Sequence, residues 1–321
     1  MITAIKKGGI LPIILAILLV IAVNFIPFYE SWFRPEASWF FGQVWINRLL
    51  FGLVLTLQAV WFQRVIHNAR FFDQWSIWPW VVFMLIAAVT PAQFLSFRAL
   101  VPNFIWLIFY QKLFYHHDRE LSNLQIHMDA GILFCVGVMF YPRFALMLPF
   151  LIILLNQFAV NDLNRFYLVI FSFLMLAIST IAIAYLFISE EWVMSLPQEL
   201  SPQLNLELLK TPSVLYSYLT LFVVLVVLTP LVYNRLGYMQ TQNRTVINML
   251  YLQVFFALMV GLASGSSFEE SLLMVGLPLA FIISFGSYHL KVRWLSNILL
   301  LLVAFTLVLV QWTYMRDVLN L

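Results

Sequence analysis

Two acidic residues flank an arginine in the aromatic segment FYESWFRPEASWFF, which follows the first apolar stretch of the chain. Glu30 or Glu36 could act as a general base toward a lipid-linked substrate, because a well-placed carboxylate accepts a proton from a reacting hydroxyl group. Arg34 could hold a phosphate through its paired N–H donors. The alternative is a solvated interfacial loop that is anchored by Trp32 and Trp39. Both interpretations stay open at the level of sequence.

A second arginine stands at a break between apolar stretches. Arg143 follows Pro142 and the segment AGILFCVGVMFY. An arginine at the mouth of a proline-broken hairpin could clamp a lipid phosphate or another anion. It could equally extend its aliphatic stem so that the guanidinium reaches the lipid headgroups. Cys135 is the only cysteine, so the chain has no intrachain disulfide or cysteine metal cluster.

Histidines and acids gather in the segment HHDRE without the pattern of a metal site. Adjacent His116 and His117 point in different directions on a helix, whereas a metal needs three or four converging ligands. We therefore expect a solvated loop that also holds Asp118 and Glu120, with no metal and no cofactor. Walker, GxSxG, HExxH and CxxC motifs do not occur in the sequence.

The composition of the chain is that of a membrane protein. Of its 321 residues 63% are hydrophobic and 10% are charged, whereas soluble domains carry about 25% charged residues. Many tryptophans stand at the ends of apolar runs, as in the interfacial belts of membrane proteins. The net charge of +3 is spread over scattered basic residues, which argues against nucleic acid as a partner. We expect membrane lipids and other membrane proteins as partners.

Hydropathy predicts an all-α fold of about eleven transmembrane helices in one domain over residues 1–321. An external loop at 189–213 separates a first group of spans at 10–188 from a second group at 214–315. The pair 130–141 and 144–160 could be two crossings or a re-entrant turn shielded by neighbouring helices. The candidate spans are 10–27, 44–65, 79–97, 100–115, 130–141, 144–160, 167–188, 214–233, 246–263, 271–288 and 294–314.

Lysine and arginine residues predict the orientation of these spans. With the N-terminus in the cytoplasm, eleven of the 17 basic residues face inside, as the positive-inside rule favours. Residues 1–26 have the charged start and apolar stretch of a signal peptide. No small-residue cleavage site follows them, so we expect a retained first helix.

Polar residues within the predicted spans are mostly neutral. Apart from Asp129 near a helix start, no acid falls clearly inside a span, whereas proton relays and ion-coupled transporters usually need such groups. Glycines at 261, 265 and 276 are expected to permit close packing. The neutral residues suit hydrogen bonding between helices: Asn24, Gln58, Thr90, Gln93, Asn103, Asn156, Gln253 and Thr306.

Three segments carry a resemblance to a known family. They are QAVWFQRVIHNA at 58–69 with WPW at 78–80, PNFIWLIFYQKLF at 102–114, and MDAGILFCVGVMFYP at 128–142. On these segments, the stretch from about Leu49 to Leu186 resembles an uncharacterised family of polytopic inner-membrane proteins of Gram-negative bacteria. The resemblance implies the bacterial inner membrane as the location and brings no established catalytic residues.

A second similarity is confined to AGILFCVGVMFYPRFALMLPFLIILL at 130–155. This segment is similar to the mid-chain helix pair of multi-span, polyprenyl-phosphate-dependent glycosyltransferases. The similarity implies an acidic catalytic residue in the first outer loop, where Glu30 and Glu36 lie. The loop here is short and lacks the paired-acid signature of those enzymes.

These observations predict a non-enzymatic integral inner-membrane subunit of an envelope assembly, secretion or lipid-handling complex. The alternative is a lipid-linked glycosyltransferase-like enzyme or lipid-carrier handler that uses Glu30, Glu36 and Arg143. An uncoupled transporter is disfavoured, because the spans lack charges and the chain shows no convincing internal repeat.

Overall fold

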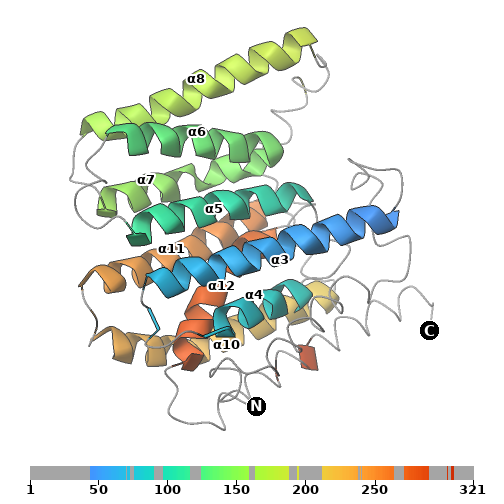
Figure 1. Cartoon of the computed structure of the whole chain (residues 1–321), viewed down its shortest axis with the longest axis vertical. Coiled ribbons are helices and arrows are strands. Elements are labelled where there is room, and N and C mark those ends of the chain that lie inside the picture. Colours follow the sequence, from blue (N-terminus) through green and yellow to red (C-terminus); the bar gives the residue numbers. More distant parts are fainter. Residues whose placement is uncertain are drawn as a thin grey trace.

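The chain is helical throughout the part that the structure describes (Figure 1). The computed structural model describes residues 44–69, 71–72, 76–89, 97–115, 124–158, 163–187, 194, 212–237, 239, 241–263, 271–288, 302 and 305–306. No strand occurs in these ranges, which confirms the predicted all-α class for them. The elements are α3 (Val44–Asn68), α4 (Trp78–Val89), α5 (Phe97–Tyr115), α6 (Leu124–Phe140), η4 (Pro142–Met147), α7 (Leu148–Phe158), α8 (Leu163–Phe187), α10 (Pro212–Leu236), α11 (Thr241–Ala263) and α12 (Ser271–Tyr288).

Four helices are long and apolar enough to cross a bilayer, which requires about 20 predominantly apolar residues. Their qualifying segments are Leu50–Asn68 in α3, Phe166–Leu186 in α8, Leu219–Leu236 in α10 and Asn243–Gly261 in α11. The other apolar helices are shorter. The fold is therefore compatible with a membrane protein.

The count of eleven crossings and the cytoplasmic N-terminus stay predictions. Each predicted span between residues 44 and 288 overlaps a helix of the structure. The span at 10–27 lies outside the described residues. The span at 294–314 is described only at residues 302, 305 and 306.

The chain reverses direction between α6 and α7. Pro142 opens the 3-10 helix η4, and Tyr141 before it leaves the helical region with φ −137° and ψ 89°. The rings of Phe134 and Phe144 lie 4.6 Å apart between centroids. A straight helix would place residues ten apart about 15 Å from each other, so the chain folds back on itself at Tyr141. The predicted break at Pro142 is thus a hairpin turn.

Helix α12 lies in the centre of the helical bundle. It contacts α4, α5, α10 and α11, and its described side chains from Met274 to Ser287 are all buried. In Figure 1, α12 is steeply inclined relative to α3, α10 and α11. A helix that is hydrophobic all round is stable only when it is covered on every side, and here four helices provide that cover.

The segment between α3 and α4 packs against the C-terminal end of α12. The ring of Phe71 meets that of Phe281 edge-on at 4.8 Å, and Phe72 meets Tyr288 in the same way at 4.8 Å. The indole N–H of Trp78 donates a hydrogen bond to the hydroxyl of Ser287. A buried tryptophan N–H usually finds such a partner, and here the bond fixes the start of α4 on the last turn of α12.

Helices α6 and α8 approach each other closely at Gly131. A Cβ atom on Gly131 would lie 2.1 Å from Ser172 Oγ and 2.4 Å from the Val169 carbonyl oxygen. Small residues allow helix backbones to meet in this way. Gly276, by contrast, has no atom within 3.7 Å of the corresponding position. The expectation that Gly276 permits close packing is therefore wrong, since its surroundings leave room for a methyl group.

Replacing these two glycines with alanine should have different consequences. Gly131→Ala should lower the free energy of unfolding by about 1–3 kcal/mol, because the added methyl group forces α6 away from α8. Gly276→Ala should not lower it, because alanine favours the helix by roughly 0.5–1 kcal/mol over glycine. Thermal unfolding of the detergent-purified variants, followed by tryptophan fluorescence, measures both effects. Equal stabilities for the two variants would contradict the described packing of α6 on α8.

Candidate functional site

Of the site residues that the sequence predicts, the structure describes only Arg143. It is the second residue of η4, directly after the buried Pro142, and its side chain is half-buried at the turn between α6 and α7. Glu30, Arg34 and Glu36 lie outside the described residues. Arg143 thus stands at the mouth of a hairpin as the sequence indicates, and a role in binding a lipid phosphate stays a prediction.

The predicted HHDRE loop at 116–120 also lies outside the described residues. Within the described part of the chain, no three His, Cys, Asp or Glu side chains come together as a metal site would require. Asp129 forms an ion pair with Lys112, with a distance of 3.2 Å between Nζ and Oδ2. Both side chains are partly exposed, so this pair between α5 and α6 contributes about 0–1 kcal/mol to stability.

Neutral side chains connect the helices in the interior. Gln58 of α3 donates a hydrogen bond from Nε2 to the Leu100 carbonyl oxygen of α5 at 2.7 Å. Tyr110 of α5 donates its hydroxyl proton to Gln253 Oε1 of α11. The predicted use of Gln58 and Gln253 in contacts between helices is confirmed.

The same use is confirmed for Thr306, whose hydroxyl lies 2.7 Å from that of Thr220 in α10. Asn156, in contrast, has an exposed side chain. Asn24, Thr90 and Gln93 lie outside the described residues.

Three polar atoms in this interior are buried without a hydrogen-bond partner among the described residues. They are Gln58 Oε1, Trp106 Nε1 and Gln253 Nε2. Trp106 packs its ring against Phe144 and Phe150, with centroids 5.6 and 5.3 Å away. These neutral groups can hold helices together through hydrogen bonds.

Helix α8 forms the edge of the bundle and packs chiefly against α6 (Figure 1). Only 11% of its spanning segment is buried, compared with 50% for α3 and α11. Its N-terminal half contacts α6 through the buried residues Val169 and Ser172. In Figure 1 its C-terminal half rises away from α6. Ile178 and Leu186 in that half expose 64% and 72% of their surface.

The C-terminal half of α8 combines this exposure with small side chains. The segment AISTIAIA at 177–184 has three alanines, a serine and a threonine among its eight residues. Ser179 and Ala182 are exposed, and Ser179 Oγ donates to the Met175 carbonyl oxygen within the helix. Small residues are enriched where transmembrane helices meet. Hydropathy predicts this span, but it does not predict the exposed surface of small residues. Only the divergence of α8 from α6 shows which residues of the span stay uncovered.

Comparison of the chain with protein-family models, with curated proteins and with solved structures finds no match. The two resemblances seen in the sequence therefore stay predictions.

The Tyr110–Gln253 pair can be tested with a double-mutant cycle. Tyr110→Phe should lower the free energy of unfolding by about 1 kcal/mol, because Gln253 Oε1 then loses its buried donor. In a Gln253→Leu background the same change should cost less, since no acceptor is left unpaired. Unfolding of the two single variants and the double variant in detergent gives the coupling. Strict additivity of the two substitutions would show that the two side chains do not interact.

Proposed function

We propose that this chain is a non-enzymatic integral subunit of an envelope assembly, secretion or lipid-handling complex in the bacterial inner membrane. It crosses the membrane about eleven times with its N-terminus in the cytoplasm. The observation that carries the proposal is the uncovered C-terminal half of α8. There a membrane-spanning helix departs from α6, the one described helix against which it packs extensively, and exposes small side chains.

The composition of this surface favours a helix of another subunit over lipid alone. Flexible acyl chains fill the gaps between bulky side chains, whereas a second helix gains close backbone contact only over small residues. Ser179, Ala182 and Leu186 follow the spacing i, i+3, i+7, which places them on one side of α8. All three are exposed. A partner helix on this side would also cover Ile178 and Ile183, which stand next to the small residues.

The interior supports a structural rather than a chemical role for the described helices. Its buried polar groups include amides, hydroxyls, indoles and the imidazole of His127, and the hydrogen bonds of Gln58, Tyr110 and Thr220 each join two segments of the chain. Such contacts position helices relative to one another. A protein built in this way presents fixed outer surfaces to its neighbours in the membrane.

Purification from native membranes in a mild detergent tests the proposal. We expect mass spectrometry to find another membrane protein in a stoichiometric ratio to this chain. The double variant Ser179→Leu/Ala182→Leu should reduce the recovered partner about tenfold, which corresponds to a loss of ~1.4 kcal/mol in binding. The matched control is Val226→Leu, which adds bulk on the exposed face of α10 and should leave the partner in place.

Two outcomes would contradict the subunit proposal. One is a chain that purifies without any stoichiometric protein partner, in particular with a polyprenyl-phosphate lipid in its place. The other is equal partner recovery from the α8 double variant and from wild type. The first outcome would favour the enzyme alternative, for which Glu30→Gln and Glu36→Gln should then abolish function at unchanged protein levels.

A further inference from the structure

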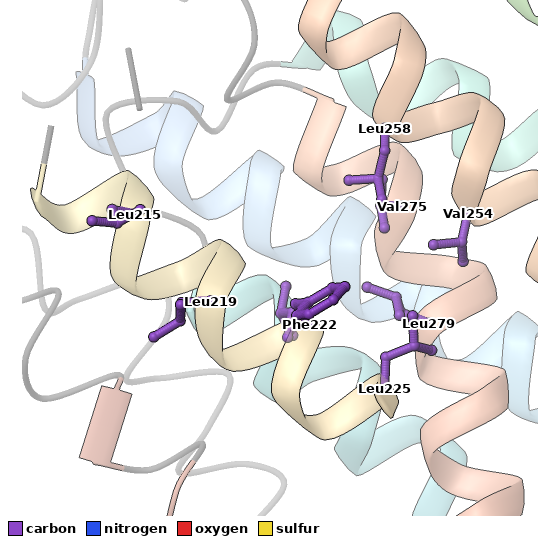
Figure 2. Close-up of a pocket in the computed structure, with 9 residues that line it drawn as sticks. Leu215, Leu219, Phe222, Leu225, Val254, Leu258, Val275 and Leu279 are labelled. Carbon is purple, nitrogen blue, oxygen red and sulfur yellow. The ribbon is translucent and has the colours of Figure 1, made fainter. Parts of the chain in front are cut away.

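A groove between α10 and α11 has α12 as its floor (Figure 2). Its volume is about 260 Å³, and every described residue that lines it is Leu, Val or Phe. Figure 2 shows Leu219, Phe222 and Leu225 of α10 on one side, Leu258 of α11 on the other, and Val275 and Leu279 of α12 between them. No side chain of this lining offers a hydrogen bond to an occupant.

The groove exists because α10 and α11 are tied together at one end only. Tyr251 of α11 donates its hydroxyl proton to Thr229 Oγ1 of α10 at 3.2 Å. The ring centroids of Tyr233 and Tyr251 lie 5.7 Å apart. These contacts join the C-terminal half of α10 to the first half of α11. Beyond them the described parts of the two helices make no comparable bond, and apolar side chains of α12 fill the bottom of the opening.

The groove occupies one half of the membrane depth. Along α10 it extends from Leu215 to Leu225, ten residues that rise about 15 Å. The hydrocarbon core of a bilayer is about 30 Å thick, so this length equals one leaflet. Arg235 and Arg244 lie at the opposite end of the α10–α11 pair. The groove is therefore in the leaflet that is remote from these two arginines.

The lining of the groove excludes water as its occupant, because an apolar cavity of ~150 Å³ stays dry and binds apolar molecules such as benzene. The occupant must be apolar and available from the side of the membrane. The length of the groove along α10, about 15 Å, is that of an acyl chain in one leaflet of the bilayer.

We propose that the groove binds one acyl chain of a phospholipid from the leaflet opposite Arg235 and Arg244. The entrance is formed by Leu215, Leu219 and Phe222, which expose 43%, 57% and 62% of their surface. An acyl chain reaches them directly from the bilayer without passing a polar group. Because the positive-inside rule places both arginines in the cytoplasm, the bound lipid belongs to the outer leaflet. This site is independent of the α8 surface and of the partner proposed for it.

The acyl-chain site is tested by filling the groove. The full chain is reconstituted in vesicles of phosphatidylglycerol with brominated acyl chains, extracted again in mild detergent and separated from free lipid. Mass spectrometry then counts the brominated lipid that stays with each protein. Leu225→Trp and Leu219→Trp should reduce this lipid at least about threefold, because the indole occupies the volume of the chain. Val226→Trp, next to the groove on the exposed face of α10, should retain as much lipid as wild type.

Leu219→Trp keeps the test valid if Leu225→Trp fails to fold, because Leu219 is more than half exposed and its substitution does not disturb the core. Equal lipid retention by wild type and Leu219→Trp would overturn the site. An equal loss from Val226→Trp would also overturn it, since the loss would then be unrelated to the groove. Either result leaves the subunit proposal untouched, because that proposal is decided by partner recovery from α8 variants.

The leaflet is tested with a fluorescent label on α10. A bimane group is placed on Leu219→Cys or, as the control at the other end of the helix, on the exposed Asn234→Cys. The native Cys135 is buried, so the introduced thiol takes the label. Brominated phosphatidylglycerol exchanged into the outer leaflet of right-side-out membrane vesicles should quench the label on residue 219 and spare that on residue 234. The reverse pattern would overturn the assignment to the outer leaflet.

Discussion

Helix α12 is buried from Met274 to Ser287, and the positions of the other central helices follow from covering it. Four helices meet its surface, and its buried side chains run without interruption from Met274 to Ser287. At Gly286 the fit is closest, because a Cβ atom there would lie 3.1 Å from Val232 of α10. Inside a bilayer, apolar surface alone does not drive helices together, so shape and hydrogen bonds must select the arrangement. The bond from Trp78 to Ser287 and the edge-on aromatic pairs at Phe71 and Phe72 provide that selection at one end of α12.

Away from α12 the packing becomes looser, and both proposed binding surfaces lie in these looser regions. The C-terminal half of α8 departs from α6, and α10 departs from α11 beyond their tyrosine contacts. In Figure 1 both openings face the same end of the bundle. The two differ in chemistry. The α8 surface carries small residues, which suit a rigid helix, whereas the α10–α11 groove is lined by branched and aromatic side chains, which suit a flexible chain.

Hydropathy alone was sufficient to predict the helical class and the positions of the helices that the structure describes between residues 44 and 288. The neutral residues Gln58 and Gln253 also identified true contacts between helices, because an amide in an apolar stretch must find a partner. The close approach at Gly131 could not be predicted, since Gly276 stands in a similar apolar sequence, and a Cβ atom there would lie at an ordinary van der Waals distance from Ile86 and Phe83. The groove could not be predicted from the sequence either. Leu215, Leu219 and Phe222 have the spacing found on any lipid-facing helix. They line a cavity only because α10 diverges from α11.

The bond between Trp78 and Ser287 joins residues that are 209 positions apart in the chain. At translation rates of about 5–20 residues per second, α12 leaves the ribosome roughly 10–40 seconds after the start of α4. During that interval α4 can pack on α3, but Trp78 and the aromatic segment before it lack their partners on α12. Of the helices that the structure describes, α12 is the last to be synthesised, so the packing around it is completed late in biogenesis.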